Sequence, residues 1–226
     1  SKKSSYIFEK IFEREIKSPE IRILGFYPKL NYLLKKQKIK KNNLKKIIIA
    51  PTHYGTFKEL NLNRYLKTMI LKLIKSNFEV IYRPHPSNIY DKKVKNIQKS
   101  FEKYSNFFLD TSSNYLDSYS SSKFMITDVS GTAYTYAMLT KKPVFFFSKS
   151  EDKINSSNYK NLNFFRDRKK IGKIFSNIDK MIYFLNNKNN KKELKKYSKN
   201  ISIIYKNFFK KNINIFDFVY KVSKND

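Results

Sequence analysis

Residues 124–139 read FMITDVSGTAYTYAML, a short apolar run, then a polar turn, then a helical pattern. The run FMIT has the length and composition of a buried strand, and the residues after Thr132 have the spacing of a helix. Ala133 and Ala137 lie one helical turn apart, so this helix can pack closely on a sheet. A strand that turns directly into a helix is typical of βαβ folds, and this stretch therefore predicts an α/β domain.

The same alternation of short apolar runs and longer helical patterns extends over most of the chain. Strands are predicted at residues 47–50, 78–82, 106–109, 124–127 and 144–147. Helices are predicted at residues 58–75, 92–104, 115–121, 132–139, 170–187 and 194–209. Regular alternation of this kind indicates a Rossmann-like parallel sheet with helices on both faces.

Three segments are expected along the chain. Residues 1–45 hold a short helical pattern, a short apolar strand and most of the basic stretch KKQKIKKNNLKK, which is typical of a linker. Residues 46–190 form the predicted Rossmann-like domain, and residues 191–226 form a helical tail rich in lysine. Because the sequence opens with Ser rather than Met, we expect an N-terminal neighbour that it does not include.

The chain is strongly basic, with a net charge of +30 over 226 residues. A field of this sign attracts nucleic acid or an anionic membrane surface. Lysine greatly outnumbers arginine, and Asn, Ile, Tyr and Phe are also abundant, so the charge can equally be a compositional bias. Base-reading proteins depend on arginine and on known motifs that are absent here, so nucleic acid is not favoured and a membrane surface is preferred.

The chain has no cysteine, and therefore no disulfide and no thiolate metal site. No apolar run approaches the roughly 20 residues of a membrane span, and the opening residues lack the apolar region of a secretory signal. We therefore expect a cytoplasmic protein. Peripheral attachment to the inner face of the plasma membrane is left open as an alternative. Neither a metal nor a cofactor is expected.

Polar residues suited to phosphate binding follow each predicted strand. Ligands of open parallel sheets bind at the carboxyl ends of the strands, so these residues are expected at one edge. The candidates are Thr52, His53, Arg83, His85, Asp110, Thr111, Asp128, Ser130, Gly131 and Thr132.

Ser130, Gly131 and Thr132 lie where the strand FMIT becomes a helix, so the unpaired N–H groups of the first helical turn point outward. Gly131 permits close approach of a ligand, two hydroxyls add donors, and the helix dipole favours an anion. The alternative is that Ser130 simply caps the helix. Asp128 would repel phosphate, so it either orients the turn or accepts a hydrogen bond from a sugar hydroxyl.

The segment RPHP, residues 83–86, places His85 between two rigid prolines. At a ligand-binding edge this histidine can donate a proton or hydrogen bond to a phosphoryl oxygen, and Arg83 can supply a fixed charge. The alternative is a structural histidine in a proline turn. His53 follows the first strand of the domain in a loop with Gly55, where it either touches the ligand or lies exposed.

The segments IIIAPTHYG (47–55), VIYRPHP (80–86) and residues 108–147, with the block Asp128 to Ala137, resemble the CDP-glycerol glycerophosphotransferases, the teichoic-acid-type polymerases and primases. The preceding GFYPKLNYLL (25–34) is similar to the segment that joins the two domains in that family. The resemblance implies the C-terminal, donor-binding half of a GT-B fold, with a missing N-terminal GT-B domain. His53 and Gly131 depart from the family pattern, where Trp and Ser are usual.

The resemblance also implies a reaction. A hydroxyl of the polymer or lipid-linked acceptor attacks the β-phosphate of a CDP-alditol donor, and CMP leaves without a required metal. His85 would be the catalytic residue of this half, and residues 130–132 would hold the pyrophosphate. Two alternatives remain: a GT-B glycosyltransferase that uses a UDP- or CMP-activated sugar in capsule or lipopolysaccharide synthesis, and a basic module that binds membrane or nucleic acid.

Overall fold

The computed structural model describes residues 45–209, apart from residues 158–159 and 161. The expectations for residues 1–44 and 210–226 lie outside the described residues.

Six strands form one parallel sheet in the order β3-β2-β1-β4-β5-β6. Strand β1 pairs with β2 on one side and with β4 on the other, although two strands separate β1 from β4 in the chain. The order therefore reverses between β1 and β4. The strands are β1 (Lys46–Ile49), β2 (Glu79–Tyr82), β3 (Phe107–Leu109), β4 (Phe124–Thr127), β5 (Val144–Phe147) and β6 (Gly172–Phe175).

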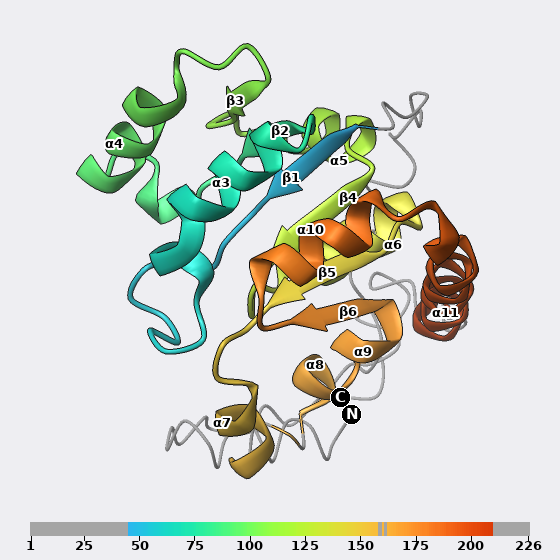
Figure 1. Ribbon diagram of the computed structural model, residues 1–226. Helices are drawn as coiled ribbons and strands as arrows, with labels where there is room; N and C mark the ends of the chain where they lie inside the picture. The colour runs from blue at the N-terminus through green and yellow to red at the C-terminus, as the bar shows by residue number, and fades with distance from the viewer. Residues whose placement is uncertain (1–44, 158–159, 161, 210–226) are drawn as a thin grey trace, which may run out of the picture.

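Helices cover both faces of this sheet (Figure 1). The side chains of Ile47 and Ile49 join one core cluster with α3, α4 and α10, whereas Ile48 points into a second cluster with α5, α6, α9 and α11. Burial on both faces explains why the central strands are almost entirely apolar. The α-helices are α3 (Leu66–Lys75), α4 (Lys92–Phe101), α5 (Leu116–Ser121), α6 (Thr132–Thr140), α7 (Glu151–Ser156), α8 (Asn163–Arg166), α9 (Arg168–Ile171), α10 (Ile178–Asn186) and α11 (Lys191–Phe209). The predicted α/β class, with a Rossmann-like parallel sheet, is confirmed.

The predicted single helix over residues 170–187 is wrong. This segment forms the edge strand β6 and then α10, whose first turn is capped by the side chain of Asn177. The backbone of Gly172 lies so close to β5 that a Cβ atom there would be 1.5 Å from the carbonyl oxygen of Val144. The apolar residues of the segment fit helical spacing, but the glycine marks a close approach between strands.

Other bounds also differ from the prediction. Helix α3 begins at Leu66 instead of Lys58, because residues 58–61 lie in a loop and the 3-10 turn η1 (Leu62–Tyr65) follows. Helix α11 begins at Lys191 and buries Ile201 in the cluster of α6 and α9. Two further 3-10 turns, η2 (Pro86–Asn88) and η4 (Lys188–Asn190), and the helices α7 to α9 were not predicted.

Candidate functional site

A cavity of about 410 Å³ opens at the carboxyl ends of β1, β2 and β4, beside the point where the strand order reverses. Crevices of this kind are where open α/β sheets bind ligands. Residues that follow these strands line it, together with residues of α5 and α6. They are Ala50, Pro51, Arg83, Pro84, His85, Pro86, Tyr115, Tyr119, Ser130, Gly131, Thr132 and Thr135. The structure thus brings together Arg83, His85 and residues 130–132 from the predicted set.

The start of α6 forms one wall of this cavity. Gly131 is the N-cap residue and no side chain caps the helix, so the alternative in which Ser130 serves as the cap does not hold. With a φ of −62°, Gly131 has an ordinary helical backbone. A Cβ atom added there would meet only Phe164, at 3.9 Å, so the protein itself leaves this space open. The helix N-terminus therefore presents backbone donors and a favourable dipole to an anion.

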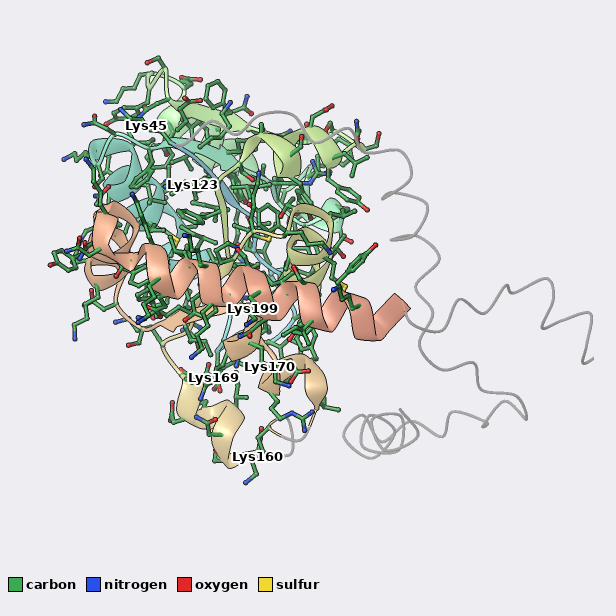
Figure 2. The ribbon with its side chains drawn as sticks, turned by 90° about the vertical axis from the view of Figure 1, so that its right-hand side faces the viewer. Lys45, Lys123, Lys160, Lys169, Lys170 and Lys199 are labelled. Carbon is green, nitrogen blue, oxygen red and sulfur yellow. The ribbon has the colours of Figure 1, made fainter. Side chains whose placement is uncertain are left out.

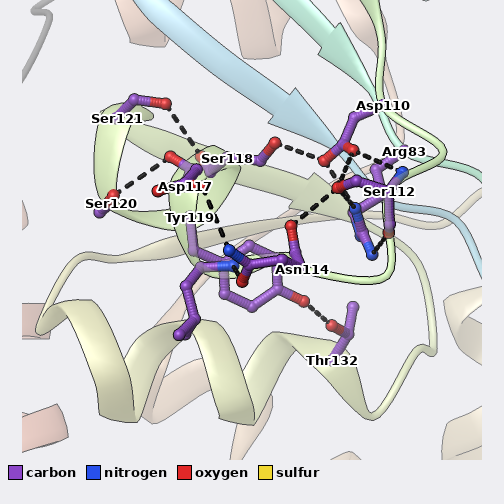
Figure 3. Close-up of polar contacts among 11 residues, drawn as sticks. Arg83, Asp110, Ser112, Asn114, Asp117, Ser118, Tyr119, Ser120, Ser121 and Thr132 are labelled. Carbon is purple, nitrogen blue, oxygen red and sulfur yellow. Dashed lines mark hydrogen bonds and ion pairs between the residues drawn. The ribbon is translucent and has the colours of Figure 1, made fainter. Parts of the chain in front are cut away.

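Two tyrosines of the α5 region complete this wall. The hydroxyl of Tyr119 is hydrogen-bonded to the hydroxyl of Thr132, as Figure 3 shows. The ring of Tyr115 packs on that of Tyr119, with 4.8 Å between centroids. Neither tyrosine was among the predicted site residues. Their spacing of one helical turn directly after the Asp110 segment was the available signal, but such spacing is equally typical of a core-facing helix.

His85 and His53 face each other at the side of the cavity, with 5.4 Å between ring centroids. Nδ1 of His85 accepts a hydrogen bond from the backbone N–H of Ser87, and Nδ1 of His53 accepts one from that of Gly55. In the neutral form each ring therefore carries its proton on Nε2. Burial, and secondly the neighbouring His53, lowers the pKa of His85 below its usual value. His85 is thus a neutral Nε2–H donor at neutral pH.

NMR of the two rings, with a titration of His85, is expected to show this arrangement. Nitrogen-detected NMR should find the neutral rings as Nε2–H tautomers and a midpoint for His85 below 6.5. His53→Gln should raise that midpoint because it removes the repulsion between two imidazolium rings. The midpoint should nevertheless stay below 6.5, since burial is the larger cause. An Nδ1–H tautomer for His85 would contradict the geometry.

Arg83 reaches the cavity with its charge already paired. Its Nη1 lies 2.6 Å from Oδ2 of Asp110, and its Nη2 donates to the carbonyl oxygen of Ser112 at 2.7 Å. Asp110 also accepts hydrogen bonds from the hydroxyls of Ser112 and Ser118 (Figure 3). Although burial opposes it, these hydrogen bonds together with Arg83 hold the pKa of Asp110 below its usual value.

His53 and Asp110 contact lining residues without lining the cavity, and three further predicted residues lie outside the lining as well. Asp128 is 1% exposed and both of its oxygens accept backbone hydrogen bonds, Oδ1 from Thr52 at 3.0 Å and Oδ2 from Leu62 at 2.8 Å. Direct contact between Asp128 and a ligand is therefore contradicted, whereas the alternative that it orients the turn agrees with these contacts. Thr52 is itself buried, and Thr111 is exposed outside the cavity lining.

Within the part of the chain that the structure describes, no three His, Asp or Glu side chains gather into a group that could hold a metal ion. None of the helices described is long and apolar enough to cross a membrane.

Fold and site together define a Rossmann-like α/β domain with an uncapped helix N-terminus and a neutral histidine at its ligand-binding edge. The chain matches the family model "CDP-Glycerol:Poly(glycerophosphate) glycerophosphotransferase" over residues 1–214. It belongs to this family.

Individual relatives agree with this assignment. The chain is 32% identical over 143 residues to GgaB, a minor teichoic acid biosynthesis protein of Bacillus subtilis (strain 168), in a match that covers 60% of this chain and 14% of GgaB. A structure of the wall teichoic acid polymerase TagF has a TM-score of 0.51 at 24% identity, covering 88% of this chain and 48% of TagF. Another TagF structure has a TM-score of 0.54 at 22% identity, covering 97% and 56%. The likeness to TagF concerns the fold, and this chain spans only part of each relative.

Proposed function

We propose that this chain is the donor-binding part of a transferase that moves glycerol phosphate, or a related alditol phosphate, from a CDP-activated donor to a cell-surface polymer. The observation that carries the proposal is the shared cavity, where the uncapped start of α6 and the Nε2–H tautomer of His85 meet. Family membership and the likeness to GgaB, a teichoic acid biosynthesis protein, support the substrate class.

In this proposal the pyrophosphate of the donor lies on residues 130–132, where backbone N–H groups and the helix dipole offset its charge. An acceptor oxygen forms a bond to the β-phosphorus and the bond to CMP breaks. His85 donates from Nε2 to a phosphoryl oxygen, so it stabilises the charge that develops there. Arg83 is held in place by Asp110, while Asp128 holds the turn. The base that takes the acceptor proton is proposed to come from an N-terminal GT-B domain.

Removal of two hydroxyls from the start of α6 tests this proposal. Ser130→Ala combined with Thr132→Ala is expected to weaken CDP-glycerol binding about tenfold or more, because hydrogen bonds to a charged phosphate are lost. Isothermal titration calorimetry measures the effect. Thr111→Ala is the matched control, since Thr111 is exposed and lies outside the cavity lining. Undiminished binding by the double variant would remove the phosphate role of α6.

The identity of the donor needs a separate measurement. A thermal-shift panel of CDP-glycerol, UDP-sugars and CMP-sugars is expected to show the largest stabilisation with CDP-glycerol, because a ligand stabilises the state that binds it. A larger shift with a UDP- or CMP-sugar would keep the site and replace the donor by a nucleotide sugar, as in capsule synthesis.

A lysine-rich side of the molecule supports a further proposed partner, an anionic membrane surface at the inner face of the plasma membrane. Figure 2 labels lysines on this side above, along and below α11: Lys45, Lys123, Lys160, Lys169, Lys170 and Lys199. Binding to vesicles that contain phosphatidylglycerol is expected, with affinity that falls steeply with salt and is unchanged by His85→Ala. Sedimentation with vesicles measures it, and salt-insensitive or absent binding would contradict this partner.

We also propose the segment limits 1–45, 46–190 and 191–226. The start of β1 at Lys46 and of α11 at Lys191 supports these limits. The burial of Ile201 against α6 and α9 indicates that α11 packs on the domain instead of extending away from it.

A further inference from the structure

A second concave region lies on the other face of the sheet, between α3 and α4. Two adjoining cavities of about 470 and 550 Å³ share Lys67 in their linings. Both helices follow a strand of the parallel sheet, so they run from its carboxyl edge toward the opposite edge. Ten residues of helix span about 15 Å. We call these two cavities the basic groove.

The charged lining of the basic groove is entirely cationic. Its cations are Lys58, Arg64, Lys67, Lys72, Lys75, Lys93 and Lys103. Lys72 is paired with Asp179, whereas no carboxylate of the described residues forms an ion pair with the others. Unpaired cations that share a concave surface repel one another and raise the local concentration of anions. The groove therefore has the charge of a polyanion site.

Two of these cations are held by aromatic rings at opposite ends of the groove. Lys93 lies over the ring of Tyr54 at 5.0 Å, and Lys103 lies over that of Tyr104 at 5.5 Å. Such packing restrains a flexible lysine side chain. The two rings therefore favour these positions of the charges, which reduces part of the entropy lost on binding.

The groove begins next to the candidate site. Tyr54, which lines its first cavity, follows His53 directly, and the ring of His53 packs against His85. The backbone N–H of Tyr54 donates to the side-chain oxygen of Asn88, and the backbone N–H of Asn88 donates to the carbonyl oxygen of His85. The candidate site itself contains one paired arginine and a neutral histidine. Of these two neighbouring regions, the groove therefore carries most of the positive charge.

We propose that the basic groove binds the phosphodiester chain of the acceptor polymer, with its reactive end toward His85. The identity of the polymer rests on the proposed function, whereas the preference for a chain rests on the groove itself. A single phosphate fills one end of a groove of this length, but a polymer can contact cations along all of it. An extended chain can lie along the concave surface between the two helices, whereas a flat bilayer does not follow that surface.

The test compares two pairs of substitutions in the full chain. Arg64→Gln with Lys67→Gln removes charge near the candidate site, and Lys75→Gln with Lys103→Gln removes it at the far end. Lys95→Gln with Lys99→Gln is the control, because these lysines lie on α4 outside both cavities and the loss of charge is the same. The probes are a dimer and a hexamer of glycerol phosphate, with binding followed by calorimetry.

The near pair is expected to weaken binding of both oligomers about tenfold, and the far pair to weaken the hexamer only, since only the hexamer reaches that end. The control should change neither, and CDP-glycerol binding should be unchanged in every variant. The proposal would be overturned if the control lost as much oligomer affinity as the near pair, or if the near pair lost none. The proposal would also be overturned if the near pair weakened binding of phosphatidylglycerol vesicles or of single-stranded DNA and left oligomer binding unchanged.

The two proposals can fail separately. If CDP-glycerol does not bind the wild-type chain, the donor assignment fails while the oligomer measurements still report on the groove. If CDP-glycerol binds and the near pair leaves oligomer binding unchanged, only the groove assignment fails.

Discussion

Asp128→Asn is expected to lower the free energy of unfolding by about 3 kcal/mol, although it only replaces one carboxylate oxygen by an NH₂ group. In the wild type both carboxylate oxygens accept backbone hydrogen bonds, from Thr52 and from Leu62, in a site that is 1% exposed. Asparagine keeps one acceptor and turns an NH₂ group toward the other backbone N–H. Two donors then face each other without water, and the turns that follow β1 and β4 lose their link. Urea unfolding followed by circular dichroism measures the change.

The difference between wild type and variant should also depend on pH. Burial raises the pKa of Asp128 from 3.8 to about 6, although the backbone hydrogen bonds oppose the shift. A folded state with the higher pKa takes up a proton first, so its stability rises as pH falls from 6 toward 3.8. The advantage of wild type over Asp128→Asn should therefore grow over this range. Asp117→Asn is the exposed control and should stay within about 0.5 kcal/mol of wild type.

Gly172→Ala is expected to lower the free energy of unfolding by about 3 kcal/mol as well, for a steric reason. The added Cβ would lie 1.5 Å from the carbonyl oxygen of Val144 and 2.6 Å from its carbon, and neither atom belongs to a side chain that can turn away. Strand β6 must then separate from β5 at this pair, at the cost of ladder hydrogen bonds. Faster hydrogen exchange along β6 should accompany the loss.

Gly131→Ala provides the matched comparison. A Cβ at Gly131 meets only Phe164 at 3.9 Å and the backbone is helical, so this variant should keep its stability within about 0.5 kcal/mol. The methyl group would instead occupy the space where the donor phosphate is proposed to approach, and CDP-glycerol binding should weaken. Equal destabilisation by both glycine substitutions would contradict the steric account of Gly172.

Some segments of the chain could be predicted from their residues and others could not, for physical reasons. The run FMIT at residues 124–127 could be predicted as a strand because three apolar residues and a β-branched threonine are followed directly by a polar turn, and the run is too short for a helix. Residues 170–187 were predicted as a single helix because Ile171, Ile174, Phe175 and Ile178 satisfy helical spacing, although Ile174 and Phe175 lie in a short edge strand. Only the contact between Gly172 and Val144 separates the two cases, and that contact is not local.

The features of the candidate site likewise divide into those that local sequence predicts and those that depend on distant segments. The position of His85 and residues 130–132 at the cavity could be predicted because each follows a predicted strand, and in a parallel sheet all such positions lie at one edge. The burial of Asp128 was left open, since its partners Thr52 and Leu62 are 76 and 66 residues away. Tyr119 and the basic groove were missed for a related reason. Their neighbours come from other βα units, and periodicity within one segment carries no information about them.

Hydrophobic spacing and turn chemistry within short segments were enough to predict the α/β class, five of the six strands described, and the position of Arg83, His85 and residues 130–132 after strand ends. The pairing of β1 with β4 could be seen only in the folded chain, and this pairing sets which polar residues face the cavity and which lie behind it. In the folded chain Asp128 accepts hydrogen bonds from backbone N–H groups, and no side chain caps α6. Helices α3 and α4 together line the basic groove. The physical reason is that strand order and burial depend on packing between distant segments, whereas local patterns specify only what each segment can form.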